Sequence, residues 1–254
     1  MKGLYILQQY TLKFKKKNLY QTFQITFHQR RSSFLNQKFF FNSNCLCLLE
    51  SKRINSYMSH NLNSPWTFYY FEKANPQNPD DTYDKCIHKI AKVYTAEEFW
   101  HYYSHINKPD QLEPRFSLHF FRNDSRAMWE DPENQNGGAF FYKVNDKSQT
   151  KYLWERLLLN LIGEQLNEDI IGVVVTPRPK LDFIYIWHKT AESEEIRLEI
   201  CRQLQNLFEL PLQFTIGYNI FNQKNHEQRL NYIITKTGPV LQTANNEPKQ
   251  PKKQ

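Results

Sequence analysis

The chain has 254 residues, and its 33 Lys and Arg against 26 Asp and Glu give a net charge of +7 at pH 7. This length is enough for one large domain or two small ones, each with a packed core. No apolar run approaches the roughly 18 residues of a membrane-spanning helix, and the four cysteines fit neither a disulfide framework nor the spacing of zinc ligands. We therefore expect a soluble, cytoplasmic protein with reduced thiols and no membrane partner.

The positive charge is concentrated at the N-terminus. The first 57 residues hold ten Lys and Arg and the single acid Glu50, a net charge of +9, which leaves 23 bases and 25 acids, or −2, for the remainder. Nucleic-acid binding by that remainder must therefore be local rather than spread over a broad basic face. We expect residues 1–57 to be a disordered basic arm. Two alternatives stay open, a mitochondrial transit peptide, which is also poor in acids, and a start of translation at Met58.

Seven short segments after the arm have the pattern of β-strands. Each is rich in β-branched or aromatic residues and is bounded by Pro, Asp, Asn or Gly. They comprise residues 66–72, 85–93, 115–121, 138–144, 170–176, 181–187 and 212–218. We expect one folded domain over residues 58–240, followed by a disordered tail at 241–254 that has almost no apolar residues.

Three helices are expected between these strands. The first follows Thr95, where Glu98 completes a capping box. The second and third cover residues 150–166 and 191–208, and each has apolar residues at helical spacing along one face. Because helices and strands do not alternate strictly, the order favours an α+β fold, with helices on one face of a largely antiparallel sheet. The other face is then free to bind a ligand.

The sequence contains no recognisable catalytic motif. It lacks a Gly-rich phosphate loop, a nucleophile elbow and a metalloprotease helix, and we interpret His88, His101 and His105 as surface or core residues. We therefore expect a protein that is not an enzyme and that needs no cofactor or metal.

A binding chemistry is indicated instead by Trp129 and Glu130, which are adjacent in "SRAMWEDPENQNGG". A carboxylate accepts two hydrogen bonds side by side, as the N1–H and the exocyclic amine of guanine would donate them. A neighbouring Trp stacks on the base, and the stack is stronger when the base is positively charged, as in 7-methylguanine. A Trp that merely anchors its loop to the core is the alternative.

Several further segments resemble the eukaryotic translation initiation factor 4E family, and the similarity runs from about His60 to Gly217. The matching segments, in family order, are "TAEEFWHYYSHI", "AMWEDPENQNGGAFFY", "ERLLLNLIGEQL", "GVVVTPRPK" and "IYIW". The resemblance implies a curved, largely antiparallel sheet with three helices packed on its convex face. It also implies a concave pocket that binds the 7-methylguanosine cap of messenger RNA, in translation initiation.

The resemblance assigns the residues of the cap pocket. Trp129 and Tyr83 match the two residues that stack on the base, and Glu130 matches the carboxylate that holds its edge. Arg178, with Lys180 close behind, matches the cation that contacts the phosphates, and Trp187 lies near the methyl group.

Three positions depart from the pattern of translation-promoting members. Tyr83 replaces a Trp, which is similar to the 4E-homologous branch of translational repressors, while Phe183 and Ala139 replace basic residues near the phosphates. Lys224 is a candidate to compensate for that lost charge. A repressor of the 4E-homologous type and an adaptor that has lost cap binding are therefore the alternatives to an initiation factor.

The resemblance also assigns a partner site on the opposite surface. Trp100 resembles an exposed Trp that receives a Tyr-x-x-x-x-Leu-hydrophobic helix from an initiation factor 4G-like scaffold or a 4E-binding protein, and His60, Ala96 and Leu159 match its surroundings. Glu155 and Arg156 replace the family's Leu and Glu there. We assign Trp66 and Trp154 to the structure of the domain.

Overall fold

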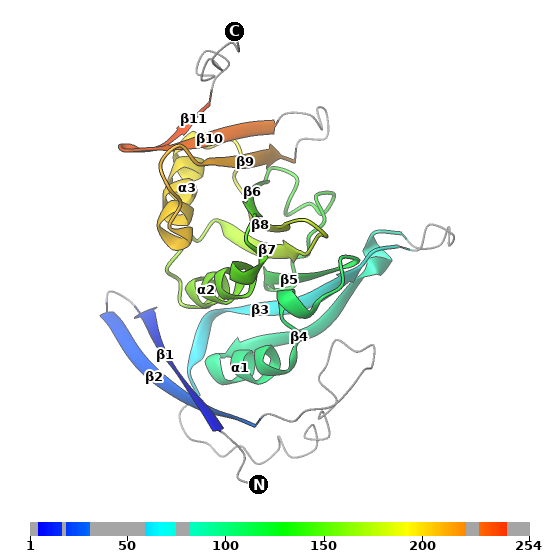
Figure 1. Cartoon of the computed structure of the whole chain (residues 1–254), viewed down its shortest axis with the longest axis vertical. Coiled ribbons are helices and arrows are strands. Elements are labelled where there is room, and N and C mark those ends of the chain that lie inside the picture. Colours follow the sequence, from blue (N-terminus) through cyan, green and yellow to red (C-terminus); the bar gives the residue numbers. More distant parts are fainter. Residues whose placement is uncertain (1–4, 17–18, 31–58, 75–81, 222–228, 243–254) are drawn as a thin grey trace.

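The computed structural model describes residues 5–16, 19–30, 59–74, 82–221 and 229–242. Its main body is a curved, nine-stranded sheet in which every pair of neighbouring strands is antiparallel (Figure 1). The strand order across the sheet is β11-β10-β9-β6-β8-β7-β5-β3-β4. In chain order the strands are β3 (Asn61–Glu72), β4 (Ile87–Thr95), β5 (Phe116–Arg122), β6 (Gly138–Val144), β7 (Ile170–Thr176), β8 (Asp182–His188), β9 (Thr215–Ile220), β10 (Arg229–Thr235) and β11 (Gly238–Leu241).

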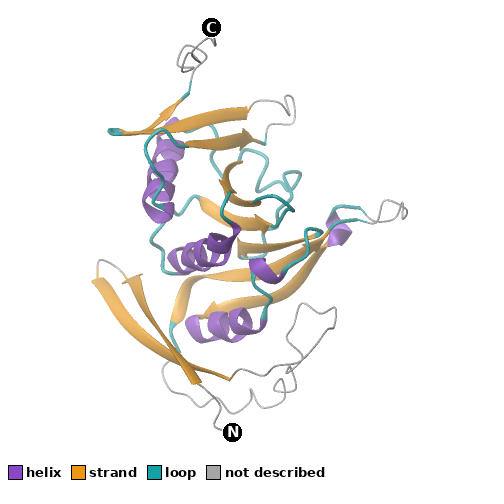
Figure 2. Ribbon diagram, viewed as in Figure 1, coloured by secondary structure: helices purple, strands orange, loops and turns teal. Residues whose placement is uncertain are grey.

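Three helices cover one face of this sheet: α1 (Ala96–His105), α2 (Thr150–Ile162) and α3 (Glu194–Phe208) (Figure 2). Local chemistry determines where two of them begin. The Thr95 hydroxyl accepts a hydrogen bond from the Glu98 amide at 3.1 Å, and the Ser193 hydroxyl does the same for the Ile196 amide at 3.3 Å. Side chains at these N-cap positions satisfy amides that the helix itself leaves unpaired.

The two faces of the sheet differ because side chains alternate along each strand. On β5, Leu118 and Phe120 join the main core beneath the helices. Phe121 instead belongs to a smaller apolar cluster with Tyr69 and Val174, so Ser117 and His119, at the same alternate positions, face away from the helices. This second, concave face carries the site described below.

The α+β prediction is confirmed, and so are the seven expected strands and three helices, with shifted ends. β4 begins at Ile87 rather than Lys85 because Asp84–Cys86 form a 3-10 turn. β10 and β11 were not expected. β10 comes directly after residues 222–228, which lie outside the described parts. β11 is only four residues long and contains Pro239, a residue that is unusual inside strands. Leu241 ends β11, so this strand extends one residue into the tail expected at 241–254.

The N-terminal arm differs from the expected disorder in two stretches. β1 (Tyr5–Lys16) and β2 (Leu19–Arg30) pair antiparallel as a separate two-stranded sheet. Both stretches are rich in Tyr, Phe, Thr, Ile and Leu, which favour strands. Disorder was expected because the whole arm is strongly basic. The rest of the arm, and the tail beyond Gln242, lie outside the described residues.

Candidate functional site

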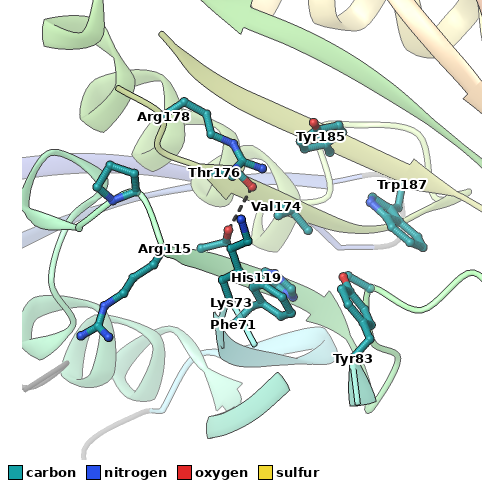
Figure 3. Close-up of a pocket in the computed structure, with 13 residues that line it drawn as sticks. Phe71, Lys73, Tyr83, Arg115, His119, Val174, Thr176, Arg178, Tyr185 and Trp187 are labelled. Carbon is teal, nitrogen blue, oxygen red and sulfur yellow. Dashed lines mark hydrogen bonds between the residues drawn. The ribbon is translucent and has the colours of Figure 1, made fainter. Parts of the chain in front are cut away.

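A cleft of about 400 Å³ opens on the concave face of the sheet (Figure 3). Its lining combines aromatic, neutral polar and basic side chains from β3, β5, β7, β8 and adjoining loops. The lining residues are Phe71, Lys73, Tyr83, Pro114, Arg115, Ser117, His119, Ala127, Val174, Thr176, Arg178, Tyr185 and Trp187.

Strand register arranges this lining in rows across the sheet. In the middle row, His119 pairs with Val174, which pairs with Tyr185. Trp187 lies in the next concave-face row on one side, two residues along β8 from Tyr185. Thr176 lies in the next row on the other side, two residues along β7 from Val174. The cleft therefore has an aromatic end at Trp187 and a basic end at the loop after Thr176, which carries Arg178.

Two loops overhang the cleft and are joined to each other by ion pairs. Tyr83, at the start of the 3-10 turn, is 47% exposed and packs on the ring of Phe71 with a centroid distance of 5.0 Å. The guanidinium of Arg126 pairs with Asp84 beside it and, at 3.5 Å, with Asp131 on its own loop. This Arg126 link fixes the Tyr83 loop relative to the loop that carries Trp129.

The Trp129 loop is held from inside. The buried Asn134 side chain donates hydrogen bonds to the backbone oxygens of Arg126 at 2.9 Å and Met128 at 2.6 Å. Gly137 lets the end of the loop approach closely, because a Cβ at this position would collide with the backbone oxygen of His188. Trp129 is half-buried and Glu130 exposed, and neither belongs to the lining of the cleft, although Ala127 of the same loop does.

Electrostatics nevertheless couple the two loops. Although Tyr83 is half exposed, partial desolvation by the surrounding residues and the negative charge of Glu130 raise its pKa to about 12. The Tyr83 hydroxyl is thus a neutral hydrogen-bonding group at physiological pH, and its ring keeps the electron-rich face that attracts a cation.

The basic end is ordered around the buried carboxylate of Asp182. This carboxylate accepts hydrogen bonds from the Arg178 amide at 3.1 Å and the Thr150 hydroxyl at 2.7 Å, and it pairs with Lys147 at 3.3 Å. Lys147 also donates to the Arg178 backbone oxygen at 2.6 Å. The backbone of the loop is therefore fixed while the side chain of Arg178 extends toward the cleft (Figure 3). Lys180 is exposed on the same loop but does not line the cleft.

Five polar or basic lining residues were not predicted from the sequence: Lys73, Arg115, Ser117, His119 and Thr176. Lys73 directly follows β3, and Arg115 directly precedes β5. The charge of Arg115 is neutralised by ion pairs with Glu72 and Glu113, each at 3.1 Å. Ser117 and His119 lie on the face shared with Phe121, and the alternation in "RFSLHFF" was the signal that would have identified them.

The positions that depart from the family pattern add no charge to the cleft. Phe183 stacks with Tyr185 at a centroid distance of 5.9 Å, and the buried Ala139 lies opposite Trp187 in the sheet. Lys224 lies outside the described residues.

The four residues of the expected partner site lie at or near helices α1 and α2. The His60 oxygen accepts from the Ala96 amide at 2.9 Å, and its ring lies 2.6 Å from the Glu97 carboxylate. Leu159 is partly buried against the main core. Trp100 is only 5% exposed and packs edge-on against Phe99 and Tyr103, so the exposure expected for Trp100 is wrong.

Other sequence predictions concern Trp and His residues. Trp66 and Trp154 are buried in the core, which confirms their structural assignment. His101 and His105 lie on one face of α1, with ring centroids 5.3 Å apart, whereas His88 stacks on Tyr70. Within the described residues, no group of three or more His, Cys, Asp and Glu is placed to hold a metal ion. No helix in this part of the chain is long and apolar enough to cross a membrane.

Comparison with known proteins identifies relatives over most of the domain. The isoform 4E translation initiation factor of Prunus domestica is 28% identical over 177 residues, which are 69% of this chain and 83% of the relative. The structure of eIF4E-3 from Caenorhabditis elegans, with the 4E-binding protein Mextli and a cap analogue, is similar with a TM-score of 0.59 and 28% identity, over 64% of this chain and 93% of that one.

A second solved structure is similar over a slightly larger part of the chain. It is eIF4E-3 from Ascaris suum with an m2,2,7G cap, at a TM-score of 0.61 and 27% identity, over 68% of this chain and 97% of that one. The sequence model of the family described as "Eukaryotic initiation factor 4E" matches residues 61–234. Together with the fold and the cleft, these matches show that the chain belongs to the eukaryotic initiation factor 4E family.

Proposed function

We propose that this protein binds the 7-methylguanosine cap of messenger RNA through its residue 58–240 domain, by reversible recognition rather than catalysis. The observation that carries the proposal is the cleft itself, in which Tyr83, Arg178 and Trp187 line one cavity although about 100 residues separate the first from the others. An aromatic end and a basic end suit a cationic base joined to phosphates.

Each cap-binding residue has a distinct role in this proposal. Tyr83 and Trp129 stack on the two faces of the base, and Glu130 accepts hydrogen bonds from its N1–H and exocyclic amine. Trp187 contacts the methyl group, and Arg178 and Lys180 bind the phosphates. The relatives solved with a cap analogue and with an m2,2,7G cap support cap binding by this fold.

The first test is a titration of the whole chain with 7-methylguanosine triphosphate, followed by Trp fluorescence, with GTP as the comparison ligand. We expect saturable quenching with a strong preference for the methylated base. Glu130→Gln replaces a charged acceptor by a neutral one and turns one acceptor into a donor, so we expect at least a tenfold loss of affinity. Trp129→Ala removes a stacking partner worth roughly 1–3 kcal/mol.

A matched control lies on the same loop. Glu133 is exposed and accepts a hydrogen bond from Ser125 at 2.9 Å, so Glu133→Gln makes the same chemical change away from the cleft and is expected to leave cap affinity unchanged. Absent binding by the wild type, or equal binding of GTP, would mean that the fold serves as a protein-binding adaptor.

A partner helix is proposed for the surface at α1 and α2. The relative solved with Mextli, and a schistosome relative solved with a 4E-binding protein, support a Tyr-x-x-x-x-Leu-hydrophobic segment from a 4G-like scaffold or a 4E-binding protein. His60 and Leu159, which are partly exposed, are the residues we assign to this surface, whereas Ala96 and Trp100 are buried. Such a protein acts in the cytoplasm, where capped messages are translated.

Repression is a second candidate for the outcome of cap binding, and Tyr83 is the observation that favours it, because a Tyr offers a smaller stacking surface than a Trp. Adding the protein to a translation extract that contains capped and uncapped reporter messages separates the two functions. Selective inhibition of the capped message indicates a repressor, whereas selective stimulation indicates an initiation factor.

A further inference from the structure

His119 is a buried polar side chain in the cleft whose role the proposed cap contacts leave unexplained. It is 2% exposed, and its Nδ1 atom has no hydrogen-bond partner among the described residues. Its ring lies between Phe71, stacked at a centroid distance of 6.1 Å, and Phe121 at 6.3 Å. Native proteins rarely leave a buried nitrogen without a partner, and the same side chain lines the cleft.

The imidazole is neutral. Burial lowers the pKa of His119 to about 3, and a neutral imidazole presents one donor and one acceptor. The absence of charge suits a cleft that takes a cationic base, because a second positive charge beside the base would repel it.

The register of the sheet gives the position of His119 along a bound nucleotide. His119 and Val174 form the row between Trp187, at the aromatic end, and Thr176, which precedes the Arg178 loop. The adjoining floor is also neutral and polar, because Ser117 donates a hydrogen bond to the Thr176 hydroxyl at 3.0 Å. In Figure 3, Thr176 lies at the Arg178 end of the cleft.

In a cap nucleotide the ribose connects the base to the 5′-phosphates, and its hydroxyls both donate and accept hydrogen bonds. We propose that His119, with the Ser117 and Thr176 hydroxyls beside it, forms a ribose-binding floor that distinguishes a ribonucleoside cap from its deoxy analogue. The inference rests on the proposed function, because it places the methylated base at Trp187 and the phosphates at Arg178.

The experiment compares two ligands on the full chain, 7-methylguanosine triphosphate and its 2′,3′-dideoxy analogue. The wild type is expected to bind the dideoxy ligand about fivefold more weakly, as the loss of one neutral hydrogen bond predicts. In His119→Phe, which keeps a ring between Phe71 and Phe121, that preference disappears. In His88→Phe, which changes a histidine on β4 outside the cleft, the preference is retained.

The comparison between ligands separates a binding role from a structural one, because a packing defect weakens both ligands equally. Ser117→Ala provides a second variant with a smaller change. A reduced preference of this variant for 7-methylguanosine triphosphate over the dideoxy analogue supports the ribose-binding floor. Equal affinity of the wild type for both ligands, or a preference that survives in His119→Phe, overturns the ribose assignment while cap binding stands. Failure of the wild type to bind either ligand overturns the proposed function as well.

Discussion

At the scale of single residues, a hydrogen-bonded polar chain, buried at His188 and Tyr218, joins three strands near the base of the Trp129 loop. The ring of His188 lies 2.8 Å from the Asp169 carboxylate through Nδ1 and 2.7 Å from the Tyr218 hydroxyl through Nε2. Thr190 donates to the same carboxylate from its amide at 3.0 Å and its hydroxyl at 2.8 Å. Each member of the chain is satisfied, so it fixes the ends of β7, β8 and β9 relative to one another.

This chain predicts how stability depends on pH. Burial alone would raise the pKa of Asp169, but the hydrogen bonds from His188 and Thr190 outweigh it and lower the pKa from 3.8 to about 2. Because the folded-state value lies below the unfolded one, the stabilisation is complete above about pH 4 and is lost as the pH falls toward 2. The shift corresponds to roughly 2 kcal/mol.

The measurement is urea unfolding of the wild type and Asp169→Asn at pH 7 and pH 3. We expect the difference in free energy of unfolding between the wild type and Asp169→Asn to be roughly half as large at pH 3 as at pH 7. A difference that is the same at both would show that the carboxylate contributes nothing through its ionisation.

At the scale of elements, helix α1 uses its aromatic residues for packing. Trp100, Phe99 and Tyr103 form mutual ring contacts with centroid distances of 5.4–5.9 Å. Trp100→Ala would therefore leave a cavity beneath α1, and we expect the free energy of unfolding to fall by about 3–5 kcal/mol. His101→Ala, on the more exposed side of the same helix, is the matched control. Chemical denaturation followed by circular dichroism measures both, and a loss below 1 kcal/mol for Trp100→Ala would contradict its role in the core.

At the scale of the whole molecule, positive charge and the candidate site are separated along the chain. The first 57 residues carry a net charge of +9, whereas the remainder is close to neutral. We expect the full chain to bind uncapped RNA more tightly than a chain that begins at Met58, with a salt dependence steeper by about 0.7 for each phosphate that the arm contacts.

Affinity for the isolated cap analogue is expected to be equal in the two chains. Binding isotherms at several salt concentrations test both statements, and replacing Lys15, Lys16 and Lys17 with Gln in the full chain reduces the slope without shortening the chain. An unchanged slope on removing the arm would show that the arm does not contact RNA.

The sequence predicted elements better than it predicted contacts. The capping residues Thr95 and Glu98 and the alternation in "RFSLHFF" are local signals, so α1 and β5 were found close to their observed positions. The burial of Trp100 and the partners of Arg126 depend on residues far away in the chain, which no local pattern reveals. His119 combines both cases, since its face was readable from alternation, but the lack of a hydrogen-bond partner for its Nδ1 atom among the described residues was not.

The Arg126 link between the Tyr83 loop and the Trp129 loop has a kinetic consequence. Two aromatic walls that are tied together through Asp84 and Asp131 cannot swing apart independently when a bound base departs. For a cap bound as we propose, we expect the residence time to depend on how often these ion pairs open. Because the ion pairs are partly exposed, we expect dissolved ions to shorten it. Even a cap nucleoside without phosphates would thus leave faster as ionic strength rises.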